Sequence, residues 1–298
     1  MSDGAPAHEA GAAGEPGDGP DAGRDDLAGP VAAVGPTFAP GLRGRARWTL
    51  ELVRVLAPRE LRTRYRQSVL DVTWALISPV AVLVVYGIVL TQSFDVTGEG
   101  VPYLSLAWSG LVLWTFFAGS LGGAVGSLIS SRDLVTKVPF PKEALPLSMV
   151  GASLVDLGIG LVTVVVLALV QGIRPTWTVV LAPVPLLLLV LWSAALGVFV
   201  GVFAAFVRDV PHIVQLVIRV GFFATPVMYA ASILPPAFRW TAWVSPLAVS
   251  IEAFRDAVLR GEVPDLPLLA VHLLIAAALL VAAVRYTRSV EGRLTDFI

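Results

Sequence analysis

The 298-residue sequence contains no cysteine, only two lysines, Lys137 and Lys142, and three histidines. Without cysteine, the chain can form neither a disulfide nor a thiolate metal site. The histidines, His8, His212 and His272, are too far apart in sequence to suggest a metal site. The phosphate-binding motif G-x-x-x-x-G-K-[ST] is also missing. The sequence therefore predicts no nucleotide site and no cofactor on this chain.

Charged residues are scarce, at 14% of the chain, whereas hydrophobic residues make up 56% and the mean hydropathy is +0.79. A soluble domain of this length could not bury so much apolar surface. A bilayer core about 30 Å thick is crossed by roughly 20 apolar residues, and several runs reach that length. The sequence therefore predicts an all-α polytopic membrane protein.

Six transmembrane helices are expected, at about residues 72–91, 103–129, 147–170, 179–207, 213–229 and 266–284, within a transmembrane domain of residues 72–288. The run 179–207 is so long that it should tilt, or kink at Pro183 and Pro185. Residues 1–40 are rich in glycine, alanine, proline and acidic residues, which predicts a disordered cytoplasmic tail. Residues 289–298 form a short cytoplasmic C-terminal tail.

The segment before the first span, residues 41–71, contains a helical pattern. Trp48, Leu52, Val55 and Leu56 fall on one face, with charged residues opposite. This pattern favours an amphipathic helix that lies in the membrane interface, and an ordinary packed helix is the alternative. Pro58 is expected to end or kink the helix.

Arginines are concentrated just before the first span, with eight from Arg43 to Arg66. If the chain crosses the membrane six times, both termini lie on the same side, and most of the basic residues lie on that side too. Because basic residues are in excess on the cytoplasmic side of membrane proteins, both termini are predicted to be cytoplasmic. Arg59, Arg62, Arg64 and Arg66 are placed to meet anionic headgroups or the pyrophosphate of a lipid-linked substrate. The alternative is that these arginines only set the orientation.

Between the fifth and sixth expected spans lies a segment too charged and too rich in proline to cross a membrane as one helix. Within it, Ser245 is a candidate N-cap, Pro246 suits the first helical position, and Gly261 can end the helix. We expect this outer segment either to re-enter the membrane or to lie at its surface.

Two charged side chains fall within expected spans, Asp156 in the third and Arg219 in the fifth. Such residues are costly in lipid and point to function. Their similar depths predict that they neutralise each other or face water, whereas Asp156 alone would suit a proton-coupled carrier. Aromatic residues gather in the second and fifth spans, where an interface belt or a lipid-facing position is the ordinary interpretation and the lining of a conduit is the alternative.

Six ordered segments resemble the integral-membrane permeases of ABC-2 type polysaccharide exporters, which serve O-antigen, capsule and teichoic acid. They are "RELRTRYRQSVLDVTWALISP", "SGLVLWTFFAGSL", "DLVTKVPFPKEALPLS", "VRDVPHI", "TPVMYAASILPP" and "SPLAVSIEAFRDAVLRG". The resemblance covers about residues 47–288. Asp71 departs from it, because the family usually has glycine at that position, and this puts the local backbone bend in doubt.

The resemblance implies a half-transporter in the bacterial plasma membrane that exports a lipid-linked glycan. The chain would not itself be an enzyme: it would form a homodimer with two copies of a separate ABC ATPase, which would hold ATP and Mg. Its other partners would be the glycan and membrane lipids, and no nucleic acid. The alternatives are an ABC-2 permease for drugs or small lipids and a proton-coupled carrier.

The resemblance also implies roles for particular residues. The helix near Trp48 would be a gate beside the lipid path, and the outer segment would gate the other side. A loop that couples to the ATPase would include Arg132, Asp133, Lys137, Phe140, Lys142 and Glu143. The channel-lining aromatics would be Trp114, Phe116, Phe117, Phe222 and Phe223.

Overall fold

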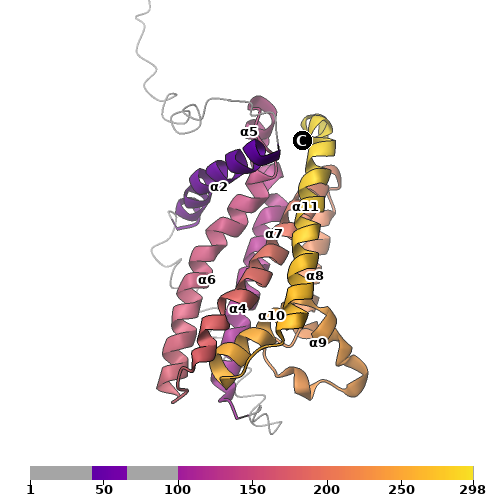
Figure 1. Cartoon of the computed structure of the whole chain (residues 1–298). Helices are drawn as coiled ribbons and strands as arrows, with labels where there is room; N and C mark the ends of the chain where they lie inside the picture. The colour runs from indigo at the N-terminus through magenta and orange to yellow at the C-terminus, as the bar shows by residue number, and fades with distance from the viewer. Residues whose placement is uncertain (1–41, 66–99, 298) are drawn as a thin grey trace, which may run out of the picture. The chain divides into compact units, whose positions relative to one another are not determined.

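The computed structural model describes residues 42–65 and 100–297, and their regular structure is helical (Figure 1). The expected first span, residues 72–91, lies outside the described residues, as do the N-terminal tail, Arg66 and Asp71. Four helical stretches in the described part are long and apolar enough to cross a membrane. They are α4 (Tyr103–Ser130), α6 (Ala144–Val170), the stretch Trp177–Phe206 and the stretch Leu266–Leu294 of α11.

The expected span 179–207 begins with a 3-10 turn, η2 (Trp177–Leu181), followed by α7 (Pro183–Phe206). Pro183 and Pro185 therefore lie in the first turn of α7. The N–H groups of a first turn have no acceptor within the helix, so a proline at these positions removes no helical hydrogen bond. The last expected span lies in α11 (Leu266–Phe297), which also continues through the residues assigned to the C-terminal tail.

The expected fifth span is shorter than the sequence predicts. Helix α8 (Val210–Ala224) has 15 residues, or about 22 Å, which is less than a bilayer core. It ends at Ala224 because Thr225 has an extended backbone (φ −96°, ψ 142°), as residues before a proline prefer.

The outer segment that follows α8 is a series of short elements. They are η3 (Ala231–Ile233), η4 (Pro236–Phe238), α9 (Trp240–Val244), α10 (Pro246–Arg255) and a π-helical turn, η5 (Asp256–Arg260). The side chain of Ser245 accepts a hydrogen bond from the N–H of Ala248 (3.4 Å), and Gly261 ends the element with a left-handed backbone (φ 72°). The predicted start and end of this helical element are therefore confirmed. Its re-entrant path through a membrane stays a prediction.

Helix α4 is deeply buried in the bundle, because it packs against α6, α7, α8 and α10 and has many more buried residues than α6. Small residues allow α4 and α7 to come very close: a Cβ at Gly201 would lie 2.7 Å from the backbone oxygen of Ala124. The outer faces of α6 and α11 expose valine, leucine and isoleucine, as expected for helices that face lipid.

The bundle has two ends, which are built from different elements. The α5 end contains α2 (Leu42–Tyr65), α5 (Arg132–Lys137), the start of α6 and the last turns of α4, α7 and α11, which share one apolar cluster. The α10 end contains the first turns of α4 together with α9, α10 and η5. Leu106 and Leu128 mark these two ends on α4, about 33 Å apart at 1.5 Å per residue.

Candidate functional site

The predicted coupling loop forms α5 and a turn that leads into α6, and its side chains divide into two sets. Arg132, Asp133 and Lys137 are exposed on α5. Phe140, Lys142 and Glu143 are instead buried, with 6%, 4% and 1% of their surfaces exposed. Only the first set can contact another protein directly.

Lys142 attaches α5 to the rest of the bundle. Its Nζ donates to the backbone oxygens of Val135 (2.6 Å) and Val138 (3.1 Å), and lies 4.3 Å from the centroid of the Phe140 ring. Burial lowers the pKa of Lys142. Within the predicted coupling loop, the Lys142 side chain turns inward and satisfies carbonyl groups at the end of α5.

Glu143 connects the coupling loop to two helices through a single arginine. Arg45 of α2 donates from Nε and Nη2 to the two carboxylate oxygens of Glu143 (3.0 and 3.1 Å) and from Nη2 to Glu291 of α11 (2.7 Å). Burial disfavours the charged arginine, but the two carboxylates outweigh this effect and raise the pKa of Arg45 above its ordinary value. The N-terminal helix, the coupling loop and the C-terminal helix are thus connected at one point.

The helix α2 packs against α6, and its buried face differs from the predicted stripe. Leu52 and Leu56 are buried as expected, but Val55 is 41% exposed. Val53 faces α6 instead: a Cβ at Gly151 would lie 3.4 Å from its Cγ1 and 3.2 Å from the Cβ of Ala57. Small residues on α6 allow this close contact along a face of α2 that neighbours the predicted stripe.

Trp48 of the predicted gate and Arg59, Arg62 and Arg64 of the arginine cluster also lie on α2. Trp48 is half-buried at the edge of the apolar cluster. Arg59 and Arg62 are exposed, and Arg64 lies in the last turn of the helix. The helix does not end at Pro58, since it continues for seven more residues to Tyr65. Whether α2 lies in the membrane interface stays a prediction.

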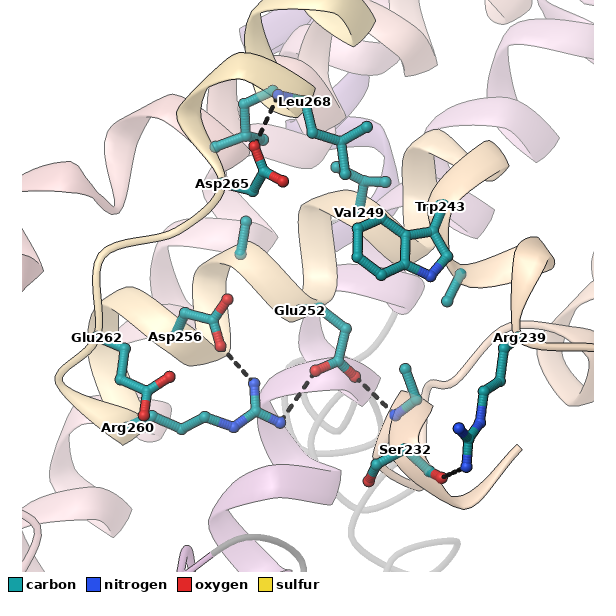
Figure 2. A pocket seen from close by; sticks show the side chains of 14 residues that line it. Ser232, Arg239, Trp243, Val249, Glu252, Asp256, Arg260, Glu262, Asp265 and Leu268 are labelled. Atoms are coloured by element: carbon teal, nitrogen blue, oxygen red, sulfur yellow. Dashed lines mark hydrogen bonds and ion pairs between the residues drawn. The ribbon is translucent and has the colours of Figure 1, made fainter. Parts of the chain in front are cut away.

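At the α10 end, a second group of charges surrounds Glu252 (Figure 2). Arg260 donates to Glu252 (3.0 Å) and to Asp256 (2.6 Å), and the backbone N–H of Ala231 donates to Glu252 (3.2 Å). Burial raises the pKa of Asp256, although its bond with Arg260 opposes this shift. These side chains lie on one wall of a cavity of about 590 Å³ beside α9 and the start of α11.

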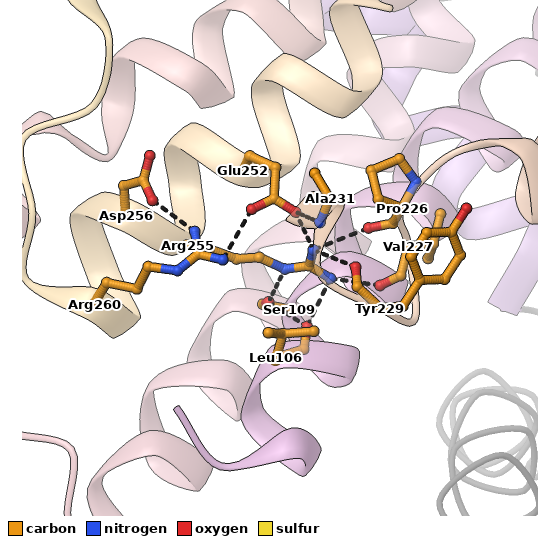
Figure 3. Close-up of polar contacts among 10 residues, drawn as sticks. All are labelled: Leu106, Ser109, Pro226, Val227, Tyr229, Ala231, Glu252, Arg255, Asp256 and Arg260. Carbon is orange, nitrogen blue, oxygen red and sulfur yellow. Dashed lines mark hydrogen bonds and ion pairs between the residues drawn. The ribbon is translucent and has the colours of Figure 1, made fainter. Parts of the chain in front are cut away.

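Arg255 is completely buried beside this group and connects three parts of the chain (Figure 3). Its Nη1 also donates to Glu252 (2.7 Å). Its other acceptors in the described part of the chain include Ser109 Oγ (3.4 Å) and the backbone oxygens of Leu106 (3.0 Å), Pro226 (2.9 Å), Val227 (2.6 Å) and Tyr229 (3.1 Å). The guanidinium therefore fixes the loop after α8 to the first turns of α4.

Arg255 lies in the charged outer segment and is not among the functional residues predicted from the sequence. A signal was present, because residue 255 follows the apolar Ile251 by four positions and so lies on the same helical face. Gly110 on α4 supplies the space: a Cβ there would lie 2.0 Å from the oxygen of Val227 and 2.6 Å from Arg255 Nη2.

The predicted channel aromatics lie at the contact between α4 and α8. Trp114, Phe116 and Phe117 are buried, and the Trp114 ring lies 5.8 Å from that of Phe222 in an edge-to-face arrangement. Phe223 is the only one of the five that is largely exposed, at 64%. In the single chain, the first three rings fill the core, and the lining of a channel stays a prediction.

The predicted neutralisation of Asp156 by Arg219 is not seen. Asp156 is half-buried on α6, Arg219 is exposed on α8, and the ion pairs among the described residues do not include one between them. The reason is the arrangement of helices, because α8 packs mainly against α4 and α7. Comparable depth in two helices does not make them neighbours.

Comparison with known proteins gives a match over most of the chain. A family model described as ABC-2 type transporter matches residues 51–259. The O-antigen export system permease protein RfbA of Myxococcus xanthus is 36% identical over 177 residues, which are 59% of this chain and 67% of the relative. Two RfbA permeases of Klebsiella pneumoniae are 27% and 26% identical, each over 72% of this chain and 82% of the relative.

Proposed function

The chain belongs to the ABC-2 type transporter family, and we propose that it is the transmembrane subunit of a transporter that exports a lipid-linked polysaccharide. The observation that carries this proposal is the similarity to three O-antigen export permeases. The four long apolar helices support a multi-pass membrane protein. The membrane is proposed to be the bacterial inner membrane.

The energy for export is proposed to come from a separate ABC ATPase, because the sequence carries no phosphate-binding loop. Two copies of the chain would form the passage and two copies of the ATPase would hold ATP and Mg. In this arrangement the α5 end and both termini face the cytoplasm, and the α10 end faces outward. The excess of basic residues at the α5 end supports this orientation.

The docking surface for the ATPase is proposed to be the exposed face of α5, with Arg132, Asp133 and Lys137. Two features support this choice: the face protrudes with charges of both signs, and its base is fixed by Lys142 and Glu143. A force on α5 would therefore reach α2 and α11 through Arg45 and Glu291. This connection would couple ATP hydrolysis to the proposed lipid gate.

The arginines Arg59, Arg62, Arg64 and Arg66 are proposed to bind the pyrophosphate of the lipid carrier. A guanidinium group presents paired donors that match phosphate oxygens. The exposure of Arg59 and Arg62 on α2 supports this role, since both can reach a ligand without moving the helix from α6. Each arginine near an anionic surface contributes about 1 kcal/mol of attraction.

Depletion of the protein in its own host tests the cargo. We expect lipid-linked glycan to accumulate at the inner leaflet while the surface glycan decreases, because synthesis continues without export. Glycan accessible to an impermeant label on intact cells, and total lipid-linked glycan in extracts, give the two measurements. A normal surface glycan together with a loss of drug resistance would contradict the proposal in favour of a drug permease.

Co-purification tests the docking surface. In the double variant Arg132→Glu and Lys137→Glu, we expect recovery of the ATPase with the tagged chain to decrease at least about tenfold, since charges at an interface select the partner. Arg174→Glu is the matched control, because Arg174 is exposed near the other end of the bundle. If both variants recover equal amounts of ATPase, the exposed face of α5 is not the docking surface.

A further inference from the structure

The cavity at the α10 end is built from both polar and apolar side chains. Its volume is about 590 Å³, within the range of sites that hold small molecules. Trp243 on α9 contributes an indole that is 59% exposed. Figure 2 shows this ring together with Val249 and Glu252, which also line the cavity.

The charges of the cavity disfavour an anion. Four carboxylates line it, from Glu252, Asp256, Glu262 and Asp265, against the two guanidinium groups of Arg239 and Arg260. Arg260 is already bound to Glu252 and Asp256. Formal charge in the cavity is therefore negative, so a phosphate or pyrophosphate would be repelled.

Hydrogen-bonding groups nevertheless remain for a neutral ligand. Asp256 and Asp265 each use Oδ1 for a contact within the chain, with Arg260 and with the N–H of Leu268, and in the described part their Oδ2 atoms make no hydrogen bond. Arg239 uses Nε and Nη2 for the backbone oxygens of Leu234 (3.2 Å) and Ser232 (3.4 Å), which leaves Nη1 as a donor. The cavity thus presents carboxylate acceptors and a guanidinium donor around an aromatic face.

We infer that this cavity binds one or two uncharged sugar units of the exported glycan. The ring face of a sugar carries C–H groups that pack on an indole, and its hydroxyl groups both donate to carboxylates and accept from a guanidinium. This inference depends on the proposed function for the identity of the glycan. Under this inference, two parts of the substrate bind at different places: the pyrophosphate binds to the arginines at the α5 end, and the sugars bind at the α10 end.

Binding of short oligosaccharides to the purified full-length chain in lipid nanodiscs tests the inference. The probe is the surface polysaccharide of the source organism, cut into short fragments and freed of lipid and phosphate by mild acid. We expect saturable binding by titration calorimetry, weakened about fivefold or more in Trp243→Ala, because the aromatic face is lost. Trp240→Ala is the matched control, since Trp240 lies on the same helix, is 60% exposed and does not line the cavity.

Three results would overturn the inference. One is equal affinity of Trp243→Ala, Trp240→Ala and the unaltered protein for the fragments. The second is displacement of the fragments by inorganic pyrophosphate, which would make the cavity an anion site. The third is Trp243-dependent binding of spermidine without binding of the fragments, which would make it a cation site.

The proposed function and the cavity can fail separately. If depletion stops glycan export but Trp243→Ala binds the fragments normally, the function stands and the cavity has another role. If depletion leaves export unchanged, the proposed function fails whatever the binding experiment shows.

Discussion

At the α5 end, Arg45 is partly exposed and binds carboxylates from the coupling loop and from α11, whereas at the α10 end Arg255 is buried and binds mainly backbone oxygens. Side-chain partners can rearrange, and salt screens charges that reach solvent. Backbone carbonyl groups cannot move without moving the chain. The contrast indicates an α5 end that can adjust, where the ATPase is proposed to dock, and an α10 end that is fixed.

The largest effect is expected for Arg255→Gln. Glutamine cannot reach the same set of oxygens, so several buried carbonyls and Glu252 would lose a charged donor. We expect the free energy of unfolding to decrease by about 3–5 kcal/mol. Thermal unfolding in detergent, followed by size-exclusion chromatography, measures this change. Arg239→Gln, on the exposed side of the same segment, serves as the control and should cost less than about 1 kcal/mol.

A second large effect is expected for Gly110→Ala. The added Cβ would lie 2.0 Å from the backbone oxygen of Val227, so α4 and the loop that Arg255 holds must separate. We expect a loss of about 3 kcal/mol in the same unfolding measurement. Gly126→Ala is the control on the same helix, because a Cβ at Gly126 has no neighbour within 4 Å. Equal behaviour of the two variants would show that the α10 end is more adaptable than we infer.

Lys142→Met should have an intermediate effect, of about 2 kcal/mol, because the backbone oxygens of Val135 and Val138 lose their charged donor. Lys137→Met, in the same loop but exposed, should change stability by less than about 0.5 kcal/mol. Limited proteolysis at α5 gives a second measurement, since cutting should increase only in Lys142→Met. Faster cutting in Lys137→Met alone would reverse the roles assigned to the two lysines.

The smallest effect, and the sharpest comparison of the two ends, is expected for Arg45→Gln. Loss of the contacts with Glu143 and Glu291 should cost about 1 kcal/mol at low salt, because the arginine is partly exposed. At about 1 M NaCl the Debye length falls to about 3 Å, so the difference from the unaltered protein should become smaller. The difference for Arg255→Gln should stay unchanged. A salt dependence of the same size at both ends would remove the distinction.

Local features of the fold could be predicted because they depend on residues that are close in sequence. Hydropathy located α4, α6, α7 and α11, and the cap at Ser245 and the left-handed Gly261 defined the element between them. The sequence predicts that the fifth span continues to residue 229, because the apolar run does not stop at Pro226. In the structure α8 ends at Ala224, because Thr225 precedes a proline and adopts an extended backbone.

The sequence by itself determined that the chain is an apolar helical protein with a short charged helix between two spans, because hydropathy and capping act within a few turns. Only the tertiary structure decided which charges are partners, since Arg45 lies 98 residues from Glu143 and 246 from Glu291. It also decided that Lys142 and Arg255 turn inward while Lys137 stays exposed. The Arg255 guanidinium is buried because acceptors from segments far away in the sequence meet it, and the helical pattern could show only that residue 255 lies on the apolar face.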